Sequence, residues 1–206
     1  FVSNGIPEEA CVGKFSIGAG KQVVFSHGNL RFTVEDWLTH QEDEGTWCFY
    51  ANQYDCEYYK DYPGEVSLLN WGYHPSYTVN DNFTGRFPQE DRFILLTDCE
   101  FPYENDWGSV VGDGKTWRTL SKAEWQYLLN DRDNASGLYR LGVTVAGLAN
   151  CVVLAPDSYN GTIKASYDAE EWKLAEADGV VCLPSAGYAA GGADRNAGTA
   201  TPGSCG

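Results

Sequence analysis

The feature that most constrains this chain is its middle segment, residues 46–114, in which neither a helical nor a strand period persists for long. Aromatic residues in this segment are spread among Asp, Asn and Gly. A stretch of this length without regular periodicity is typical of functional loops or of an excursion around a core. Phe93–Thr97 is a predicted strand within it. The regular elements of the fold must therefore come mainly from the flanking segments.

One helix is predicted to begin after residue 121. Residues 121–124 read Ser-Lys-Ala-Glu, which is a capping box: the Ser hydroxyl accepts a backbone N–H and the Glu carboxylate reaches back. Trp125, Leu128 and Leu129 then follow at the spacing of one apolar helical stripe. We expect this helix to end near Asp131.

A second helix is predicted from residues 168–171, which read Asp-Ala-Glu-Glu and give another Asp-x-x-Glu start. Trp172 and Ala175 share the inner face of this helix. Gly179 suits the left-handed position that ends many helices. The two helices are the best-defined elements of the sequence.

Short strands are predicted around these helices. Residues 14–32 alternate between apolar and polar side chains and are divided by glycines, which favours strands joined by turns. Leu141–Val145 and Cys151–Leu154 are predicted strands on either side of a turn at Gly147. Val180–Leu183 is a further strand. The predicted fold class is α+β with short antiparallel strands and long loops.

The chain is long enough for one domain. It has 206 residues, of which 43% are hydrophobic, and a domain of this size buries roughly 70% of its unfolded surface. Residues 1–13 show no periodicity and are predicted to be a leader or linker, with one domain over residues 14–206. Apolar runs reach about five residues, far short of the ~20 that a spanning helix needs. Membrane insertion is therefore not expected, and no signal peptide is visible.

Charge excludes some partners. The chain holds 29 Asp and Glu against 14 Lys and Arg, a net charge of −15, and the acidic excess is concentrated in residues 31–114. Such a chain repels phosphate backbones, so nucleic acid and anionic lipid are not predicted partners. The excess indicates a solubilising surface, and a cation site or a basic ligand are the alternatives.

No cofactor is predicted, and calcium is the one metal left open. Its ligands would be carboxylate oxygens, although their spacing here fits no EF-hand loop. The acidic candidates are Asp81, Glu90, Asp91, Asp98, Glu100, Glu104 and Asp106.

Seven cysteines are present, and the odd number leaves at least one outside any intrachain pair. None forms a Cys-x-x-Cys motif, so a zinc site is not predicted. Cys151 and Cys182 lie in apolar strand-like runs and are interpreted first as small buried residues and second as a disulfide. No motif for nucleophilic, zinc or phosphate chemistry is present, so no catalytic residue is assigned.

Exposed aromatic and polar side chains in the loops are the candidate ligand-binding residues, because Tyr and Trp offer large, stiff contact surfaces. By contrast, Trp107, Trp117, Trp125 and Trp172 lie in structured contexts and are predicted to be core. The candidate binding residues are Tyr58, Tyr59, Tyr62, Tyr73, His74, Tyr77, Tyr188, Arg195 and Asn196.

Several runs resemble a family of surface proteins from gut bacteria. The opening runs at residues 15–30 and 47–55 are similar to the family's pattern, as is Leu154–Asp157. The most specific matches are the WRTL…EW block at residues 117–128 and the LP-x-AGY block at residues 183–188, within a longer similar run at residues 176–188. On these residues the chain resembles the formylglycine-generating-enzyme type of C-type-lectin fold, which includes retroelement-diversified variable proteins.

The resemblance implies a loop-rich α+β fold and a non-catalytic ligand-binding module of a cell-surface or phage-borne receptor or adhesin, which recognises a protein or glycan. Two alternatives remain: a structural or pilus-type assembly subunit, and a formylglycine-type oxidase or hydrolase. No motif in the chain matches the paired active-site cysteines of the enzymes. The Glu-Pro-Asn and Gln-Pro-Asp triplets of calcium lectins do not occur either.

The resemblance also implies an extracellular or cell-surface location. Family members usually continue beyond the Gly-rich loop into a further strand, so the domain is expected to be truncated at its C-terminal end. An unpaired sheet edge there would favour strand addition or an oligomer contact.

Overall fold

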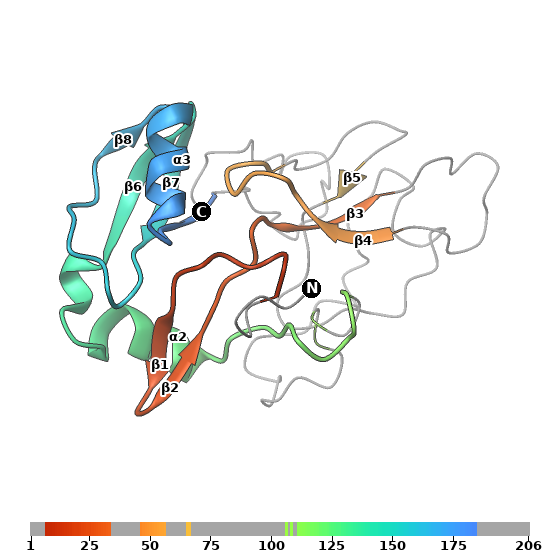
Figure 1. Cartoon of the computed structure of the whole chain (residues 1–206), viewed down its shortest axis with the longest axis horizontal. Helices are drawn as coiled ribbons and strands as arrows, with labels where there is room; N and C mark the ends of the chain where they lie inside the picture. Colours follow the sequence, from red (N-terminus) through yellow and green to blue (C-terminus); the bar gives the residue numbers. More distant parts are fainter. Residues whose placement is uncertain are drawn as a thin grey trace, which may run out of the picture.

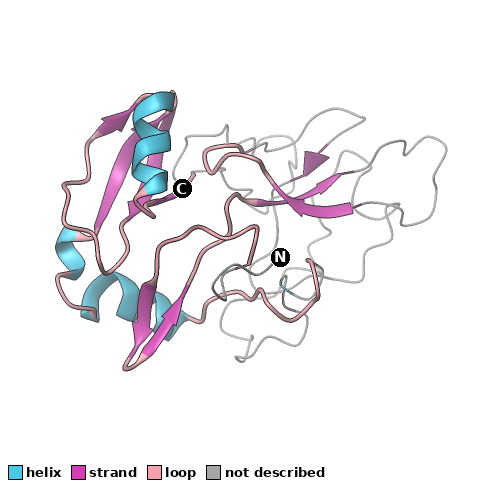
Figure 2. Cartoon of the chain, viewed as in Figure 1, coloured by secondary structure: helices cyan, strands magenta, loops and turns pink. Residues whose placement is uncertain are grey.

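The computed structural model describes residues 7–33, 46–56, 65–66, 106, 108 and 111–184. In these ranges the chain has a mixed α+β fold with two α-helices and small sheets, as the sequence predicts (Figures 1 and 2). The strands are β1 (Phe15–Gly18), β2 (Lys21–Val23), β3 (Leu30–Thr33), β4 (Thr46–Phe49), β5 (Glu65–Val66), β6 (Tyr139–Val145), β7 (Leu148–Leu154), β8 (Ser166–Tyr167) and β9 (Val181–Leu183). The helical segments are α2 (Lys122–Gln126), the π-helical η4 (Tyr127–Asp131), the 3-10 turn η5 (Ala135–Gly137) and α3 (Ala169–Ala177).

A four-stranded sheet of order β8-β6-β7-β9 organises the second half of the chain. β6 and β7 form a hairpin around the predicted turn, where Ala146 and Gly147 have φ of 49° and 89°, as a two-residue type I′ turn requires. β9 pairs antiparallel with β7, but β8 runs parallel to β6. This parallel pair departs from the predicted antiparallel strands because residues 155–165 cross back between β7 and β8.

Both faces of this sheet are covered near its centre, which explains why β9 and the second half of β7, Cys151–Leu154, are apolar. On one face, Cys151 and Val153 of β7 pack with Trp172 of α3. On the other face, Leu154 of β7 packs with Phe15 of β1 and with the segment after α2. The sheet therefore lies between α3 and the layer formed by the β1–β2 hairpin, α2 and η4 (Figure 1).

α3 begins and ends as its sequence predicts. The Asp168 carboxylate accepts the N–H groups of Glu170 and Glu171, and the Glu171 side chain accepts the N–H of Asp168, which completes the capping box. Trp172 is 1% exposed. Gly179 follows the helix with φ of 83°, the left-handed conformation that glycine adopts most easily.

The helix predicted over residues 122–131 forms, but its second half is π-helical. Ser121 and Glu124 make the predicted capping box. Beyond Gln126 the N–H of Arg132 bonds the C=O of Tyr127, which is an i→i+5 bond. Arg132 is nearly fully buried, and its side chain is fixed by carbonyls at the start of the sheet. We attribute the wider turn to this anchored side chain.

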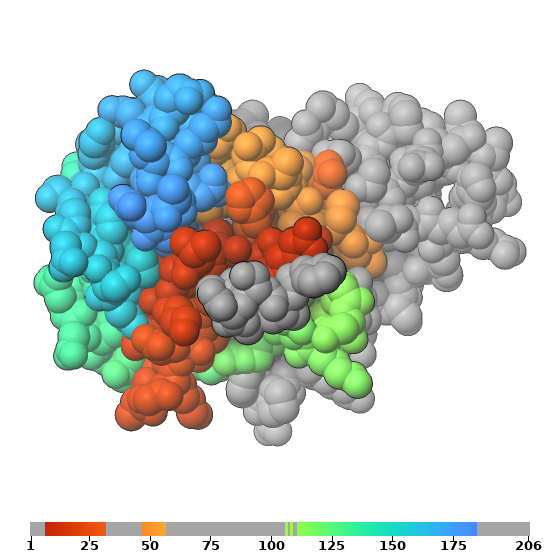
Figure 3. Space-filling view, viewed as in Figure 1, coloured from red at the N-terminus to blue at the C-terminus, as the bar shows by residue number. Residues whose placement is uncertain are grey.

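Residues 7–13, which belong to the segment expected to be a leader or linker, pack against the core. The N–H of Cys11 bonds the C=O of Phe25 at 2.8 Å, and Cys11 is 4% exposed. Gly13 lies so close to Gly179 that a Cβ atom on Gly13 would collide with the Gly179 carbonyl oxygen. In the space-filling view this N-terminal segment lies against the C-terminal part (Figure 3).

The remaining described sheet has the order β4-β3-β5, with Leu30 opposite Phe49. Its end is fixed by Tyr50, whose N–H bonds the C=O of Asn29 at 2.9 Å. The Arg31 guanidinium lies 4.8 Å from the centroid of the Tyr50 ring, a favourable cation–π distance. The predicted strand Phe93–Thr97 lies outside the described residues.

Candidate functional site

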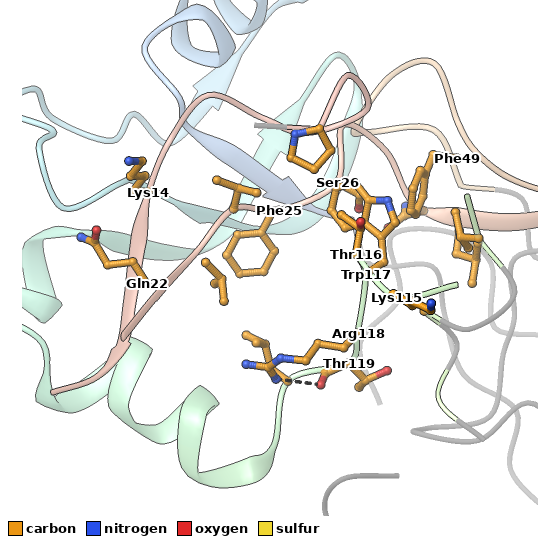
Figure 4. A pocket seen from close by; sticks show the side chains of 18 residues that line it. Lys14, Gln22, Phe25, Ser26, Phe49, Lys115, Thr116, Trp117, Arg118 and Thr119 are labelled. Atoms are coloured by element: carbon orange, nitrogen blue, oxygen red, sulfur yellow. Dashed lines mark hydrogen bonds between the residues drawn. The ribbon is translucent and has the colours of Figure 1, made fainter. Parts of the chain in front are cut away.

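A cleft of about 690 Å³ lies between the β1–β2 hairpin and residues 111–120 (Figure 4). Its volume falls in the range of about 300–1,000 Å³ that is typical of ligand pockets. Residues 22–26 form one wall and residues 115–120 form the other. The described lining residues are Pro7, Lys14, Gln22, Val23, Val24, Phe25, Ser26, Asn29, Leu30, Phe49, Gly108, Val111, Lys115, Thr116, Trp117, Arg118, Thr119 and Leu120.

Fixed aromatic rings form two apolar areas of the cleft. The Phe25 ring packs edge-on against the buried Phe15 ring at a centroid distance of 4.9 Å, and it lies 5.9 Å from the ring of Trp125. The rings of Phe49 and Trp117 meet edge-to-face at 5.1 Å. Rings held by such contacts lose little conformational entropy when a ligand covers them.

The wall opposite the hairpin is held by two Asp carboxylates. Asp106 accepts the N–H of Gly108 at 2.7 Å and the N–H of Thr119 at 2.9 Å. Asp113 accepts the N–H groups of Lys115 and Thr116, both at 2.8 Å, and these hydrogen bonds hold its pKa below the ordinary value. Bonds of this kind fix the backbone of a loop. The wall is therefore shaped by local hydrogen bonds as well as by packing.

Three of the described residues that line the cleft carry cationic side chains. Arg118 donates to both carboxylate oxygens of Glu124, at 2.7 and 2.8 Å, so its charge is balanced and its pKa is raised. Lys14 and Lys115 make no ion pair within the described part of the chain. Figure 4 places them at opposite ends of the cleft. The lining residues given above include no carboxylate.

A second polar cluster surrounds the buried Gln53. The Gln53 amide donates to Glu176 Oε1 at 2.8 Å and to Cys11 Sγ at 3.2 Å. His27 Nδ1 lies 3.5 Å from the same Glu176 oxygen. Burial, and then the nearby Glu176 charge, raises the pKa of Cys11 to about 12. The Cys11 thiol therefore stays protonated near neutral pH, which does not suit a nucleophile.

Arg132 and two cysteines are also buried and have structural roles. Arg132 donates to the carbonyls of Ala155 and Leu138, both at 3.0 Å, and to the Asp157 carboxylate at 3.2 Å. Cys151 and Cys182 are both buried, and neither takes part in a disulfide within the described residues, in line with the first of the two interpretations above. A hydrogen bond to Cys151, together with burial, raises the pKa of Cys182.

The residues predicted from the sequence to bind a ligand lie outside the described residues. This applies to Tyr58, Tyr59, Tyr62, Tyr73, His74, Tyr77, Tyr188, Arg195 and Asn196. Among the calcium candidates, Asp106 alone is described, and its carboxylate accepts backbone N–H groups. The described residues contain no group of three or more His, Cys, Asp or Glu arranged to hold a metal ion.

The four tryptophans that the sequence predicts to be core differ in how far the structure buries them. Trp172 is fully buried, whereas Trp125 and Trp117 are half-buried and Trp107 lies outside the described ranges. Trp117 lines the cleft. Sequence reasoning missed the cleft because its two walls lie far apart in the chain. A usable signal was the cationic and aromatic run at residues 115–118.

Comparisons with known proteins give no relative. No protein-family model matches the chain, and neither a curated protein nor a solved structure matches it. Within the described ranges, no helix is both long enough and apolar enough to cross a membrane. The functional argument therefore depends on the geometry of the cleft.

Proposed function

We propose that the chain is a non-catalytic ligand-binding module and that the cleft between the β1–β2 hairpin and residues 111–120 is its binding face. The observation that carries this proposal is the combination of anchored aromatic rings with ammonium groups that have no ion-pair partner among the described residues, in one cavity of about 690 Å³. Pockets that bind ligands commonly combine an apolar lining with a few polar groups that set orientation.

The wider setting of the proposal comes from the sequence. We propose a cell-surface or phage-borne receptor or adhesin that recognises a protein or glycan, on a fold of the formylglycine-generating-enzyme type of C-type lectin. Residues 117–128, which carry one of the specific motifs of the resemblance, supply both a capped helix and part of a cleft wall. The loop aromatics of residues 58–77 remain candidate contacts.

The proposal is tested by screening the full chain against arrays of immobilised glycans and proteins. Each ligand found is then measured with Thr116→Trp, which places a bulky side chain at an exposed position in the cleft. Thr162→Trp is the matched control, since Thr162 is also exposed and does not line the cleft. We expect Thr116→Trp to weaken binding by about tenfold or more and Thr162→Trp to leave it unchanged. Ligands that bind both variants equally would exclude the cleft as the binding face.

A further inference from the structure

One edge of the β1–β2 hairpin is a free strand edge. β2 belongs to a two-stranded sheet, so within the described sheets its outer side pairs with no strand. The N–H of Cys11 bonds the C=O of Phe25, so the polar groups of Phe25 face the N-terminal segment. Val24 lies between β2 and the antiparallel bridge of Ala10 with Ser26. Because peptide groups alternate in direction along an antiparallel ladder, we take those of Val24 to point to the opposite side.

This free edge borders the cleft. Residues 22–26, which start in β2 and continue beyond its end at Val23 to the Ala10–Ser26 bridge, line the cleft without a break. In an extended conformation, at about 3.3 Å per residue, such a segment spans roughly 16 Å. An unpaired edge of this kind is a template for another strand. Val24 is half-buried, so a strand added beside it would also be partly shielded from water.

Charge selects the partner. Lys14 and Lys115 lie at opposite ends of the cleft (Figure 4) and make no ion pair among the described residues, whereas Arg118 is balanced by Glu124. These two ammonium groups, in a cleft whose described lining residues include no carboxylate, contrast with the net charge of −15 for the whole chain. Complementary charge at an interface supplies specificity and a faster encounter.

We infer that the cleft binds an extended acidic peptide segment, which adds a strand along the outer side of β2 and of Val24, the residue that follows it. This inference rests on the proposed function and names its ligand class. Backbone hydrogen bonds to Val24 would supply register and affinity, and carboxylates near the two ends of the peptide would pair with Lys14 and Lys115. A glycan lacks the regular alternation of N–H and C=O groups that this edge matches.

The test uses the full chain and a fluorescent six-residue probe of sequence Glu-Val-Thr-Val-Thr-Glu, followed by fluorescence anisotropy. Two analogues carry N-methyl groups, one at the second and fourth residues and the other at the third and fifth. Since a strand bonds its neighbour through every second peptide group, only one analogue is expected to lose binding. An analogue with Lys in place of both Glu residues is expected to bind about tenfold more weakly or worse.

Matched variants examine the protein side. Val24→Pro removes the outward N–H and leaves the bonds to the N-terminal segment in place, whereas Val24→Thr keeps that N–H. We expect Val24→Pro alone to lose about tenfold or more in affinity for the probe. Lys14→Glu with Lys115→Glu is expected to weaken binding similarly. The control pair, Lys21→Glu with Lys122→Glu, has the same charge change outside the cleft and is expected to bind normally.

Several results would overturn the inference: no binding of the probe to the wild-type chain, equal binding of the two methylated analogues, or equal binding of the Glu and Lys peptides. These peptide measurements use the wild-type chain and hold even where Val24→Pro fails to fold. If ligands from the arrays no longer bind the Thr116→Trp variant, while the peptide probe does not bind the wild-type chain, the proposed function stands and only the peptide assignment is removed. Array ligands insensitive to Thr116→Trp would remove both.

Discussion

The side-chain amide of Gln53 bonds the main chain at Cys182 as the peptide group of a neighbouring strand would. Its Oε1 accepts the N–H of Cys182, and its Nε2 lies 3.5 Å from the C=O of Val180. Gln53 is 1% exposed. The carboxamide thus covers part of the outer edge of β9 and ties residues 46–56 to the four-stranded sheet, in agreement with the adjoining orange and blue surfaces in Figure 3.

Replacing Gln53 with Ala is expected to destabilise the fold by about 2–4 kcal/mol, because a buried N–H and a buried C=O would lose their partner. Urea unfolding of the two proteins measures this difference. Gln126→Ala is the control, since Gln126 is exposed on α2, and it should stay within about 0.5 kcal/mol of wild type. An equal effect of the two substitutions would contradict the bridging role of Gln53.

Gly179 and Gly20 make a matched pair of glycine substitutions. Both have positive φ, 83° and 68°, but a Cβ on Gly179 would lie 2.7 Å from Gly13 Cα, whereas Gly20 has open space around it. Gly20→Ala should cost about 1–2 kcal/mol from backbone strain alone. Gly179→Ala adds a steric clash with backbone and should cost about 3 kcal/mol or more. Equal melting temperatures for the two variants would argue against the close contact of Gly13 and Gly179.

The local elements of this fold were predictable from the sequence. The capping boxes at Ser121 and Asp168 form as predicted, and the turn at Gly147 joins two strands. Each depends on residues close together in the chain, where backbone geometry and side-chain reach decide the outcome. Trp172 was likewise predictable as core, because helical spacing places it beside Ala175 on one face.

The long-range features were not predictable in the same way. The cleft joins residues 22–26 to residues 115–120, and the sequence contains no signal for their distance in space. Gln53 looks like an ordinary loop residue, yet it bonds a strand 129 positions away. Residues 7–13 lack periodicity because single contacts, such as that of Cys11 with Phe25, hold them to the core. Tertiary contacts decide such placements.

Stability at low pH should depend on Asp157. Burial opposes its ionisation, but hydrogen bonds from Ser16, Gln22 and Arg132 outweigh burial and hold its pKa below the ordinary value. A lowered pKa in the folded state gives stability that is present above the unfolded pKa, about 3.9, and is lost as pH falls through the folded pKa.

The corresponding measurement compares wild type with Asp157→Asn in urea at about pH 6 and about pH 3. The variant should have a smaller free energy of unfolding than wild type at the higher pH. This difference between the two proteins should narrow at the lower pH, because the wild-type carboxylate is then becoming protonated. The contributions of the other acidic residues to the pH dependence of stability are common to both proteins, so they cancel when the two free energies of unfolding are subtracted. A gap that is constant or widens on acidification would contradict the stabilising role of the ionised carboxylate.

The two helical tryptophans should differ in their contribution to stability. Trp172 is 1% exposed and its ring meets that of Tyr167 edge-to-face at 5.5 Å, so Trp172→Ala should cost about 3–5 kcal/mol through lost burial and a cavity. Trp125 is half-buried beside Phe25, and solvent can fill part of the space left by Trp125→Ala, so a smaller cost of about 1–3 kcal/mol is expected. Chemical denaturation of both variants gives the comparison. A Trp125→Ala cost equal to or above that of Trp172→Ala would mean that the layer formed by α2 and the hairpin, and not the layer under α3, supplies most of the stability.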